Sequence, residues 1–123
     1  MSWDFSGERA IYAQIAEQVK LRIIAGLYPV GTRLPSVREL AAEAAVNPNT
    51  MQRALSELER EGLLYSERTS GRFVTEDGAR IAKIKEELAQ EVIDDFFARM
   101  ERLGYVRSAA RQLIINTEVQ SNE

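Results

Sequence analysis

Hydrophobic side chains recur at intervals of four residues near the start of the chain, which predicts an amphipathic helix. Its apolar face carries Ile11, Ile15, Val19 and Ile23. Gly26 ends this helix, because glycine accepts the left-handed conformation common at a helix terminus. One face of the predicted helix is therefore available to cover a core.

Two more helices follow in close succession, each with capping residues at its start. Ser36, with Glu39 three residues later, forms a capping box that begins the second helix. Asn47 caps the third, and Pro48 occupies its first position, where a missing N–H costs nothing. The apolar stripe of the third helix consists of Met51, Ala54, Leu55 and Leu58. A short helix, a tight connection and a second helix are typical of a helix-turn-helix.

Short extended segments complete the predicted first domain. Residues 32–34 are expected to be extended, since the proline that follows disfavours a helical conformation before it. Residues 63–65 and 72–75 predict two strands of a hairpin, joined by a turn at Thr69-Ser70-Gly71. We therefore predict a mainly α fold with a small β-hairpin, in which residues 1–75 form a winged helix-turn-helix.

The remainder, residues 76–123, predicts a short two-helix region for dimerisation. Asp77 caps a long helix that ends at Gly104, and Ser108 caps a further short helix. The tail from Thr117 to Glu123 is expected to be frayed. Helical spacing is kept along the long helix by Ile81, Ile84, Leu88, Val92, Phe96, Met100 and Leu103, with Ile93 and Phe97 widening the stripe.

Composition excludes several classes of protein. The chain has 123 residues, 45% of them apolar, and contains neither cysteine nor histidine. Ser-His-Asp and Cys-His catalysis and ordinary zinc sites are thereby excluded. No signal peptide pattern is present, and no apolar run approaches the roughly 18 residues of a membrane span. We expect a soluble, cytoplasmic protein that is not an enzyme, with no cofactor, no metal and no membrane partner.

The net charge of −3 argues at first against a DNA partner. Residues 1–75 carry nine basic and nine acidic side chains, whereas residues 76–123 carry seven basic and ten acidic ones. The whole excess of negative charge therefore belongs to the predicted dimerisation region. The first domain is neutral, so bulk charge gives DNA binding no support.

Polar side chains at the start of the third helix carry the functional prediction. Capping explains Ser36, Glu39 and much of Asn47 without any ligand. It does not explain four further hydrogen-bonding side chains in the first two turns, namely Asn49, Thr50, Gln52 and Arg53. Such groups can bind base edges or phosphates, and the helix N-terminus itself attracts phosphate.

Basic side chains near these positions allow two interpretations. Arg38 either contacts a guanine edge or pairs with Glu39 or Glu43, and Arg53 either contacts phosphate or pairs with Glu57. In the hairpin, Gly71 serves the turn, and the arginines at 68 and 72 can lie against a phosphate backbone or in a minor groove.

The long apolar stripe needs a covering partner. A second copy of the chain is the preferred one, because two-fold dimers are the commonest oligomers and present two reading helices to a palindromic site. A groove for a small apolar ligand, an effector of unknown identity, is the alternative. The alternative for the whole chain is a winged helix that serves only as a protein-interaction module.

At the level of motifs, residues 11–75 resemble the winged helix-turn-helix of the GntR family of bacterial transcription regulators. The C-terminus, with Phe96-Phe97 and Leu103-Gly104-Tyr105, looks like the small dimerisation region of the YtrA-type subfamily. The motifs that carry the resemblance are Ile11-Tyr12-x-Gln14-Ile15, Gly31-x-Arg33-Leu34-Pro35-Ser36-Val37-Arg38-Glu39-Leu40-Ala41, Asn47-Pro48-Asn49-Thr50, Arg53-Ala54-Leu55 and Leu58-Glu59-x-Glu61-Gly62-Leu63.

The resemblance implies a dimeric regulator, usually a repressor, often encoded beside ABC transporter genes. It implies DNA contacts from Arg38 and from the start of the recognition helix. Two departures are Pro48, where many members carry arginine, and Thr69-Ser70-Gly71-Arg72, where the wing usually has a second glycine. The predicted DNA-binding residues are Ser36, Arg38, Asn47, Asn49, Thr50, Gln52, Arg53, Ser70, Gly71 and Arg72. The predicted dimerisation residues are Ile84, Leu88, Val92, Phe96, Phe97, Met100 and Leu103.

Overall fold

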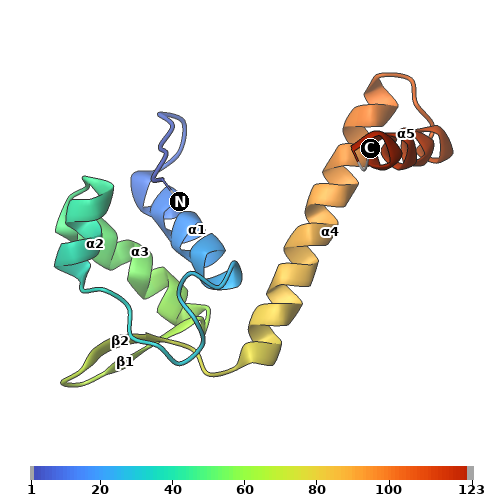
Figure 1. Cartoon of the computed structure of the whole chain (residues 1–123). Helices are drawn as coiled ribbons and strands as arrows, with labels where there is room; N and C mark the ends of the chain where they lie inside the picture. The colour runs from blue at the N-terminus through green and yellow to red at the C-terminus, as the bar shows by residue number, and fades with distance from the viewer. Residues whose placement is uncertain (1, 122–123) are drawn as a thin grey trace. The chain divides into compact units, whose positions relative to one another are not determined.

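The computed structural model describes residues 2–121, which form five helices and one hairpin (Figure 1). This confirms the predicted fold class. The elements in chain order are α1 (Ile11–Ile24), α2 (Val37–Ala44), α3 (Pro48–Arg60), β1 (Leu64–Glu67), β2 (Gly71–Val74), α4 (Gly78–Arg102) and α5 (Arg107–Ser121). None of these helices is long and apolar enough to cross a membrane.

The core of the first part of the chain lies between α1, α2, α3 and the hairpin. The apolar periodicity of the sequence identifies the side chains that face it, because residues spaced by three and four share one side of a helix. Their largest fully buried members are Ile15, Val19, Leu40, Met51, Leu55, Leu58, Leu63 and Val74. Trp3 and Phe5, which precede α1, pack against the same cluster.

Helix ends are set by glycine at the predicted positions, including Gly104, which follows α4 with a φ of +96°. Gly26 follows α1 with a φ of +84°, and Gly62 follows α3 with a φ of +79°. The end of α2 differs, since Ala45 adopts the left-handed conformation with a φ of +57°. The N–H of Val46 donates to the carbonyl of Ala41 at 3.0 Å, which closes the helix. Ala45 therefore forms the turn between α2 and α3.

The hairpin pairs β1 with β2 in antiparallel register, with Leu64 opposite Val74 and Glu67 opposite Gly71. The segment predicted to be extended joins it from the other side. The N–H of Leu34 donates to the carbonyl of Arg72, and that of Val74 donates to the carbonyl of Thr32, both at 2.9 Å. The wing is thus attached to the chain that leads into α2.

Two compact units divide the chain, the first extending to Ile84 and the second beginning at Lys85. The first turns of α4 belong to the winged helix, because Ile81 is buried in its core and Ile84 packs against it. Ile84, predicted as a dimerisation residue, therefore already contacts this core. The division falls later in the chain than the predicted boundary at residue 75.

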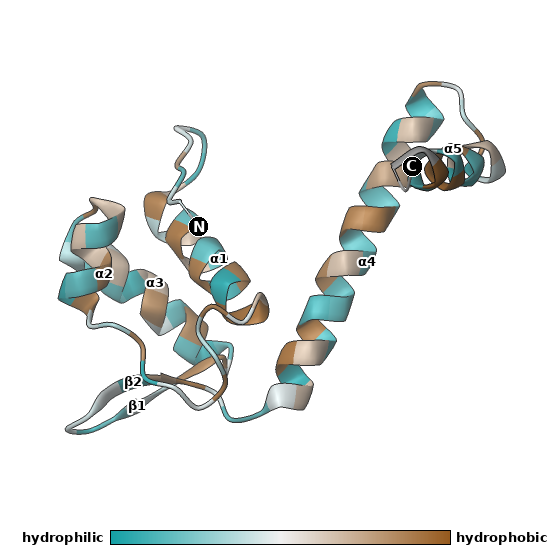
Figure 2. Ribbon diagram, in the orientation of Figure 1, coloured by the Kyte–Doolittle hydropathy of each residue, from teal (hydrophilic) through white to brown (hydrophobic). Residues whose placement is uncertain are grey.

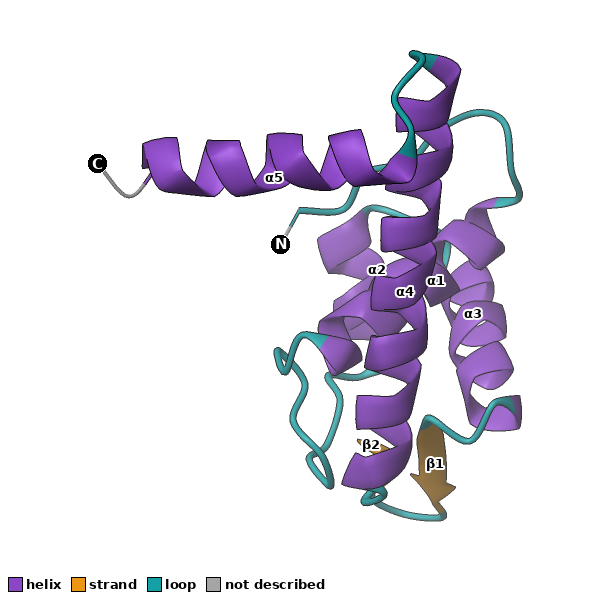
Figure 3. Ribbon diagram, turned by 90° about the vertical axis from the view of Figure 1, so that its right-hand side faces the viewer, coloured by secondary structure: helices purple, strands orange, loops and turns teal. Residues whose placement is uncertain are grey.

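The second unit contains the rest of α4 and α5, joined by a short loop (Figure 3). The prediction for the last helix was wrong at its start, since α5 begins at Arg107, before the expected cap Ser108. Part of the expected frayed tail was also wrong: α5 continues to Ser121, and residues 122–123 lie outside the described chain. Ala110, in the first turn of α5, is fully buried.

Candidate nucleic-acid interface

Two predicted DNA-binding residues at the start of α2, Ser36 and Arg38, differ in their contacts within the protein. The Ser36 hydroxyl accepts a hydrogen bond from the Glu39 N–H at 3.1 Å, which caps the helix. Arg38 is exposed in the first turn, and within residues 2–121 its guanidinium has no hydrogen bond or ion pair. Glu43, a predicted alternative partner, lies 3.6 Å from Arg22 instead. The Arg38 charge is therefore available to a ligand.

The start of α3 presents the other predicted polar groups. Asn47 Oδ1 accepts a hydrogen bond from the Asn49 N–H at 2.8 Å, so the cap is made as predicted. The side chains of Asn49 and Gln52 are exposed, and Thr50 is half-buried. They lie away from the buried stripe of the same helix, so this surface of α3 is open to a partner.

Arg53 makes a contact that neither prediction included. Its guanidinium lies 3.6 Å from the centre of the Tyr12 ring on α1, as a cation–π pair. Glu57, the predicted alternative partner, pairs instead with Arg60 at 2.6 Å. A shallow pocket at this edge is lined by Tyr12, Arg53 and the polar side chains of Asn49 and Thr50. Three predicted DNA-binding residues are thus brought together here.

The wing residue Arg72 turns toward α3. Its guanidinium donates to Glu59 Oε1 at 2.9 Å, to Gln52 Oε1 at 3.1 Å and to Ser56 Oγ at 3.5 Å. Only 14% of the Arg72 side chain is exposed. The Arg72 charge, predicted to lie against DNA, attaches the wing to α3 in this structure.

Glu59 is the acidic centre of this attachment and was missed by sequence reasoning. Partial burial raises the pKa of Glu59, but hydrogen bonds from Ser66 and Arg72, together with the Arg72 charge, lower it below the usual value. The carboxylate therefore stays ionised and holds both strands of the wing. The motif that includes Glu59 was the signal available, although it did not indicate a partner.

The wing tip and the segment before α2 lie side by side. Gly71 has a φ of +105°, and a Cβ there would lie 3.2 Å from Arg33 Nε. A pocket between the wing and the start of α2 is lined by Arg33, Ser36, Gly71 and Arg72 among others. Arg33 and Arg68 are exposed and, in the described part of the chain, have no ion-pair partner. Ser70, also exposed, lies in the turn.

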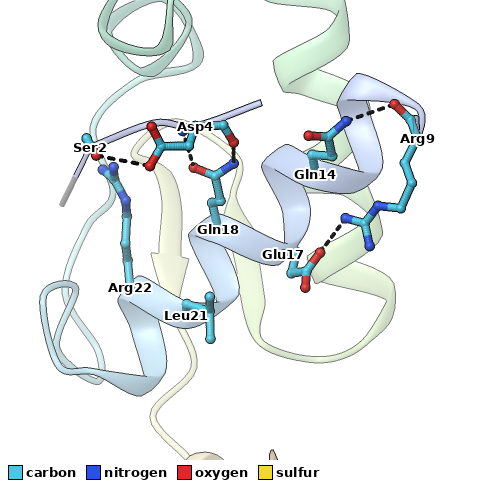
Figure 4. A pocket seen from close by; sticks show the side chains of 8 residues that line it. All are labelled: Ser2, Asp4, Arg9, Gln14, Glu17, Gln18, Leu21 and Arg22. Carbon is cyan, nitrogen blue, oxygen red and sulfur yellow. Dashed lines mark hydrogen bonds and ion pairs between the residues drawn. The ribbon is translucent and has the colours of Figure 1, made fainter. Parts of the chain in front are cut away.

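The N-terminal segment is held on α1 by two glutamines one helical turn apart (Figure 4). Gln18 exchanges hydrogen bonds with the backbone of Asp4, at 3.1 and 2.6 Å. Gln14 does the same with Ser6, at 2.8 and 2.9 Å, and also donates to the Arg9 carbonyl. Gln14 is 5% exposed, so its amide replaces water for these backbone groups. Sequence reasoning missed this role.

Beyond Ile84, the predicted dimerisation stripe consists of half-buried and exposed side chains. Leu88, Phe96, Phe97 and Met100 are half-buried. Val92 and Leu103 are 69% and 73% exposed. Figure 2 shows hydrophobic positions recurring along α4 and in α5. Within the second unit the Phe96 and Phe97 rings meet edge to face at 5.3 Å.

Comparisons with known proteins give this geometry a context. Residues 11–74 match the family described as bacterial regulatory proteins, gntR family. The chain is 38% identical over 107 residues to the HTH-type transcriptional regulator YhcF of Bacillus subtilis, covering 87% of this chain and 88% of YhcF. It is 40% identical over 97 residues to the HTH-type transcriptional repressor YtrA of the same organism, covering 74% and 75%.

Solved structures agree with the sequence relatives. A GntR family transcriptional regulator from Listeria monocytogenes superposes with a TM-score of 0.82 at 35% identity, covering 91% of this chain and 98% of that one. The DNA-binding domain of AraR in complex with operator ORX1 gives a TM-score of 0.53 at 28% identity, covering 61% and 99%. The winged helix therefore has a DNA-bound counterpart of similar fold.

Proposed function

The chain belongs to the gntR family of bacterial regulatory proteins, and on that premise we propose that it is a homodimeric repressor that binds a palindromic operator. Membership makes it a DNA-binding transcriptional regulator and not an enzyme. YtrA, which it resembles over most of its length, is a repressor, and this supports the direction of regulation proposed here. We propose that such a regulator acts in the cytoplasm, where bacterial chromosomal DNA lies.

One observation gives the main support for the proposed DNA-binding surface. Arg38 is an exposed guanidinium without a partner among the described residues, in the first turn of α2, and it precedes a recognition helix whose start is polar and open. A guanidinium with five donors matches the N7 and O6 acceptors of guanine. The first domain has no net charge, but the Arg38 guanidinium, unpaired within residues 2–121, is a positive charge at its surface, which the net charge alone does not reveal.

The exposed stripe of α4 supports the dimer. Val92 and Leu103 leave most of their apolar surface in water. A second copy covers both by two-fold symmetry, since a two-fold interface joins the same patch on each subunit. Such a dimer duplicates the recognition helix, which is why we propose a palindromic operator.

We also propose that the regulated genes include an ABC transporter operon, as the YtrA-type resemblance implies. The test is transcript abundance in a strain that lacks this gene. Transporter transcripts should rise when a repressor is removed. Unchanged transporter transcripts, with other genes changed, would contradict the target but not the DNA-binding function.

Arg38→Ala tests the DNA-binding surface. Operator sequences are first selected from random duplexes with the wild-type protein, and affinities are then measured at fixed salt. Loss of a bidentate guanine contact, worth roughly 1–3 kcal/mol, should weaken operator binding by about 5- to 150-fold. Binding of non-operator duplex should change less.

Arg60→Ala is the matched control, because Arg60 is an exposed arginine that pairs with Glu57 at the far end of α3. It should retain operator affinity, and both variants should keep wild-type circular dichroism. Unchanged operator binding by Arg38→Ala would contradict the proposed surface. A protein-interaction module would instead select no duplex sequence at all.

A further inference from the structure

Gln52 and Arg72 form a contact between the recognition helix and the wing that bears on base recognition. Gln52 is exposed on α3, four and seven residues before Ser56 and Glu59 along the same side of the helix. Arg72 Nη1 lies 3.1 Å from Gln52 Oε1. The wing therefore touches one of the side chains predicted to contact bases.

The chemistry of this pair orients the glutamine amide. A guanidinium carries only donors, whereas a glutamine amide has an acceptor oxygen and a donor NH₂ group. The oxygen of Gln52 must therefore face Arg72, and its NH₂ group faces the opposite way. The reversed amide would place two donors against each other.

Arg72 is itself held in position. Its Nε bonds to Glu59 Oε1 at 2.9 Å, a second guanidinium nitrogen lies 3.5 Å from Ser56 Oγ, and Ser66 donates to the same Glu59 carboxylate. With 14% of its side chain exposed, Arg72 has little freedom to turn toward solvent. The orientation it imposes on Gln52 is thus set before any DNA arrives.

Resting on the proposed function, we infer that Arg72 is a positioning residue that makes Gln52 recognise guanine in the operator. A free glutamine binds adenine with its oxygen on N6 and its NH₂ group on N7. Here the oxygen is shared with a guanidinium, whose charge opposes the approach of the adenine and cytosine amino groups. Guanine instead offers two acceptors, N7 and O6, to the outward NH₂ group.

Arg72→Lys tests the inference, because lysine keeps the positive charge but cannot bridge Glu59, Ser56 and Gln52 with one ammonium group. Wild-type protein should prefer guanine over adenine at one position of each half-site by on the order of ten-fold. Arg72→Lys should reduce this preference to about two-fold or less at that position. Preferences at the other positions should be retained, including the one lost in Arg38→Ala.

A double-mutant cycle separates positioning from direct contact. If Arg72 acts through Gln52, Arg72→Lys should not alter base preference further when Gln52→Ala is already present. Arg60→Lys, on the same helix, is the matched control and should retain the wild-type preference. Circular dichroism and the oligomeric state confirm that the variants remain folded.

Two results would overturn the inference while leaving the proposed function intact. One is an unchanged guanine preference in Arg72→Lys. The other is an equal effect of Arg72→Lys with and without Gln52, which indicates that Arg72 contacts DNA directly. If the wild-type protein selected no sequence at all, the proposed function and the inference would fail together.

Discussion

Ser36 and Asn47 are predicted DNA-binding residues that already have a structural role. Each side chain accepts a hydrogen bond from a backbone N–H in the first turn of its helix. Such caps contribute about 0.5–2 kcal/mol, so substituting either residue would affect folding as well as binding. Arg38 makes no such bond within residues 2–121. Its substitution therefore reports on DNA binding with the least interference from stability.

Within residues 2–121, Ala45 is the one residue with a Cβ whose φ is positive. Its φ of +57° lies in the left-handed region, which costs a residue with a Cβ roughly 1–2 kcal/mol. Ala45→Gly should remove this strain, offset in part by the greater freedom of glycine in the unfolded chain. We expect the unfolding free energy to rise by about 0.5–1 kcal/mol in urea titrations.

The matched control for that change lies three residues earlier. Ala42 is exposed in the interior of α2, where glycine is a poor helix former. Ala42→Gly should lower the unfolding free energy by about 1 kcal/mol. If both substitutions destabilised the protein, the left-handed conformation at Ala45 would be in doubt.

At the scale of elements, charge attaches the wing to α3, whereas the β-ladder joins the two strands of the wing to each other. Glu59 on α3 binds Ser66 on β1 and Arg72 on β2, so one carboxylate joins three elements. The hairpin and α3 were each predicted from sequence. Their connection was not, because periodicity identifies the buried face of an element but not the polar partners across elements.

The same limit explains the contact of Arg53 with Tyr12. Phosphate and Glu57, its neighbour one turn away, were the two predicted partners of Arg53, whereas the structure places its guanidinium over Tyr12 on another helix. The helix caps predicted from sequence were more accurate than the predicted ion pairs. Ser36, Asn47 and Asp77 each accept the expected backbone hydrogen bond. Capping failed at Ser108, since α5 already begins at Arg107. Helix caps are thus predictable from sequence, because the capping side chain and the N–H that it accepts from lie within three residues of each other.

Glu59 should make stability depend on pH. Its pKa is lowered in the folded protein, so its contribution is fully present above the usual glutamate value of about 4.3 and is lost as pH falls through the lower folded value. Glu59→Gln removes this charge. We expect the variant to be less stable by about 1–2 kcal/mol at pH 7, and the difference to shrink as pH is lowered toward 3.

Urea titrations at several pH values measure that difference. Glu87→Gln, at an exposed position on α4, is the control and should have little effect at pH 7. A deficit in Glu59→Gln that stayed constant down to pH 3 would show that the Glu59 charge does not hold the wing.

At the scale of the molecule, the excess negative charge and the exposed apolar side chains of α4 both lie in the C-terminal part of the chain. The acidic excess lies in residues 76–123, which contain none of the predicted DNA-binding residues. The exposed apolar side chains of α4 lie in the same region, beyond Ile84. Helical periodicity predicted this stripe over its full length. It could not show that the stripe's first residues serve the winged-helix core, because that depends on which turns of α4 meet it.

Leu88→Asp tests the proposed dimer. An aspartate in the middle of a buried apolar interface is left without a partner, which is strongly destabilising. Sedimentation should therefore show a monomer for Leu88→Asp and a dimer for the wild-type protein. Operator affinity should fall with it, because a monomer presents one recognition helix rather than two.

Gln90→Asp is the matched control, since it makes the same change of charge two residues away on the opposite side of α4. It should remain dimeric. A dimer that persisted in Leu88→Asp would place the interface elsewhere on the chain.

The N-terminal segment gives the protein a built-in spectroscopic reporter. Trp3 is the single tryptophan of the sequence, and its ring lies 3.7 Å from the Arg22 guanidinium on α1. Its emission therefore follows the release of the segment that Gln14 and Gln18 hold, while circular dichroism follows the helices. Transitions that coincide indicate one cooperative unit, and an earlier change in fluorescence indicates that the segment detaches first. An unlabelled sample thus suffices to observe that detachment, with and without DNA.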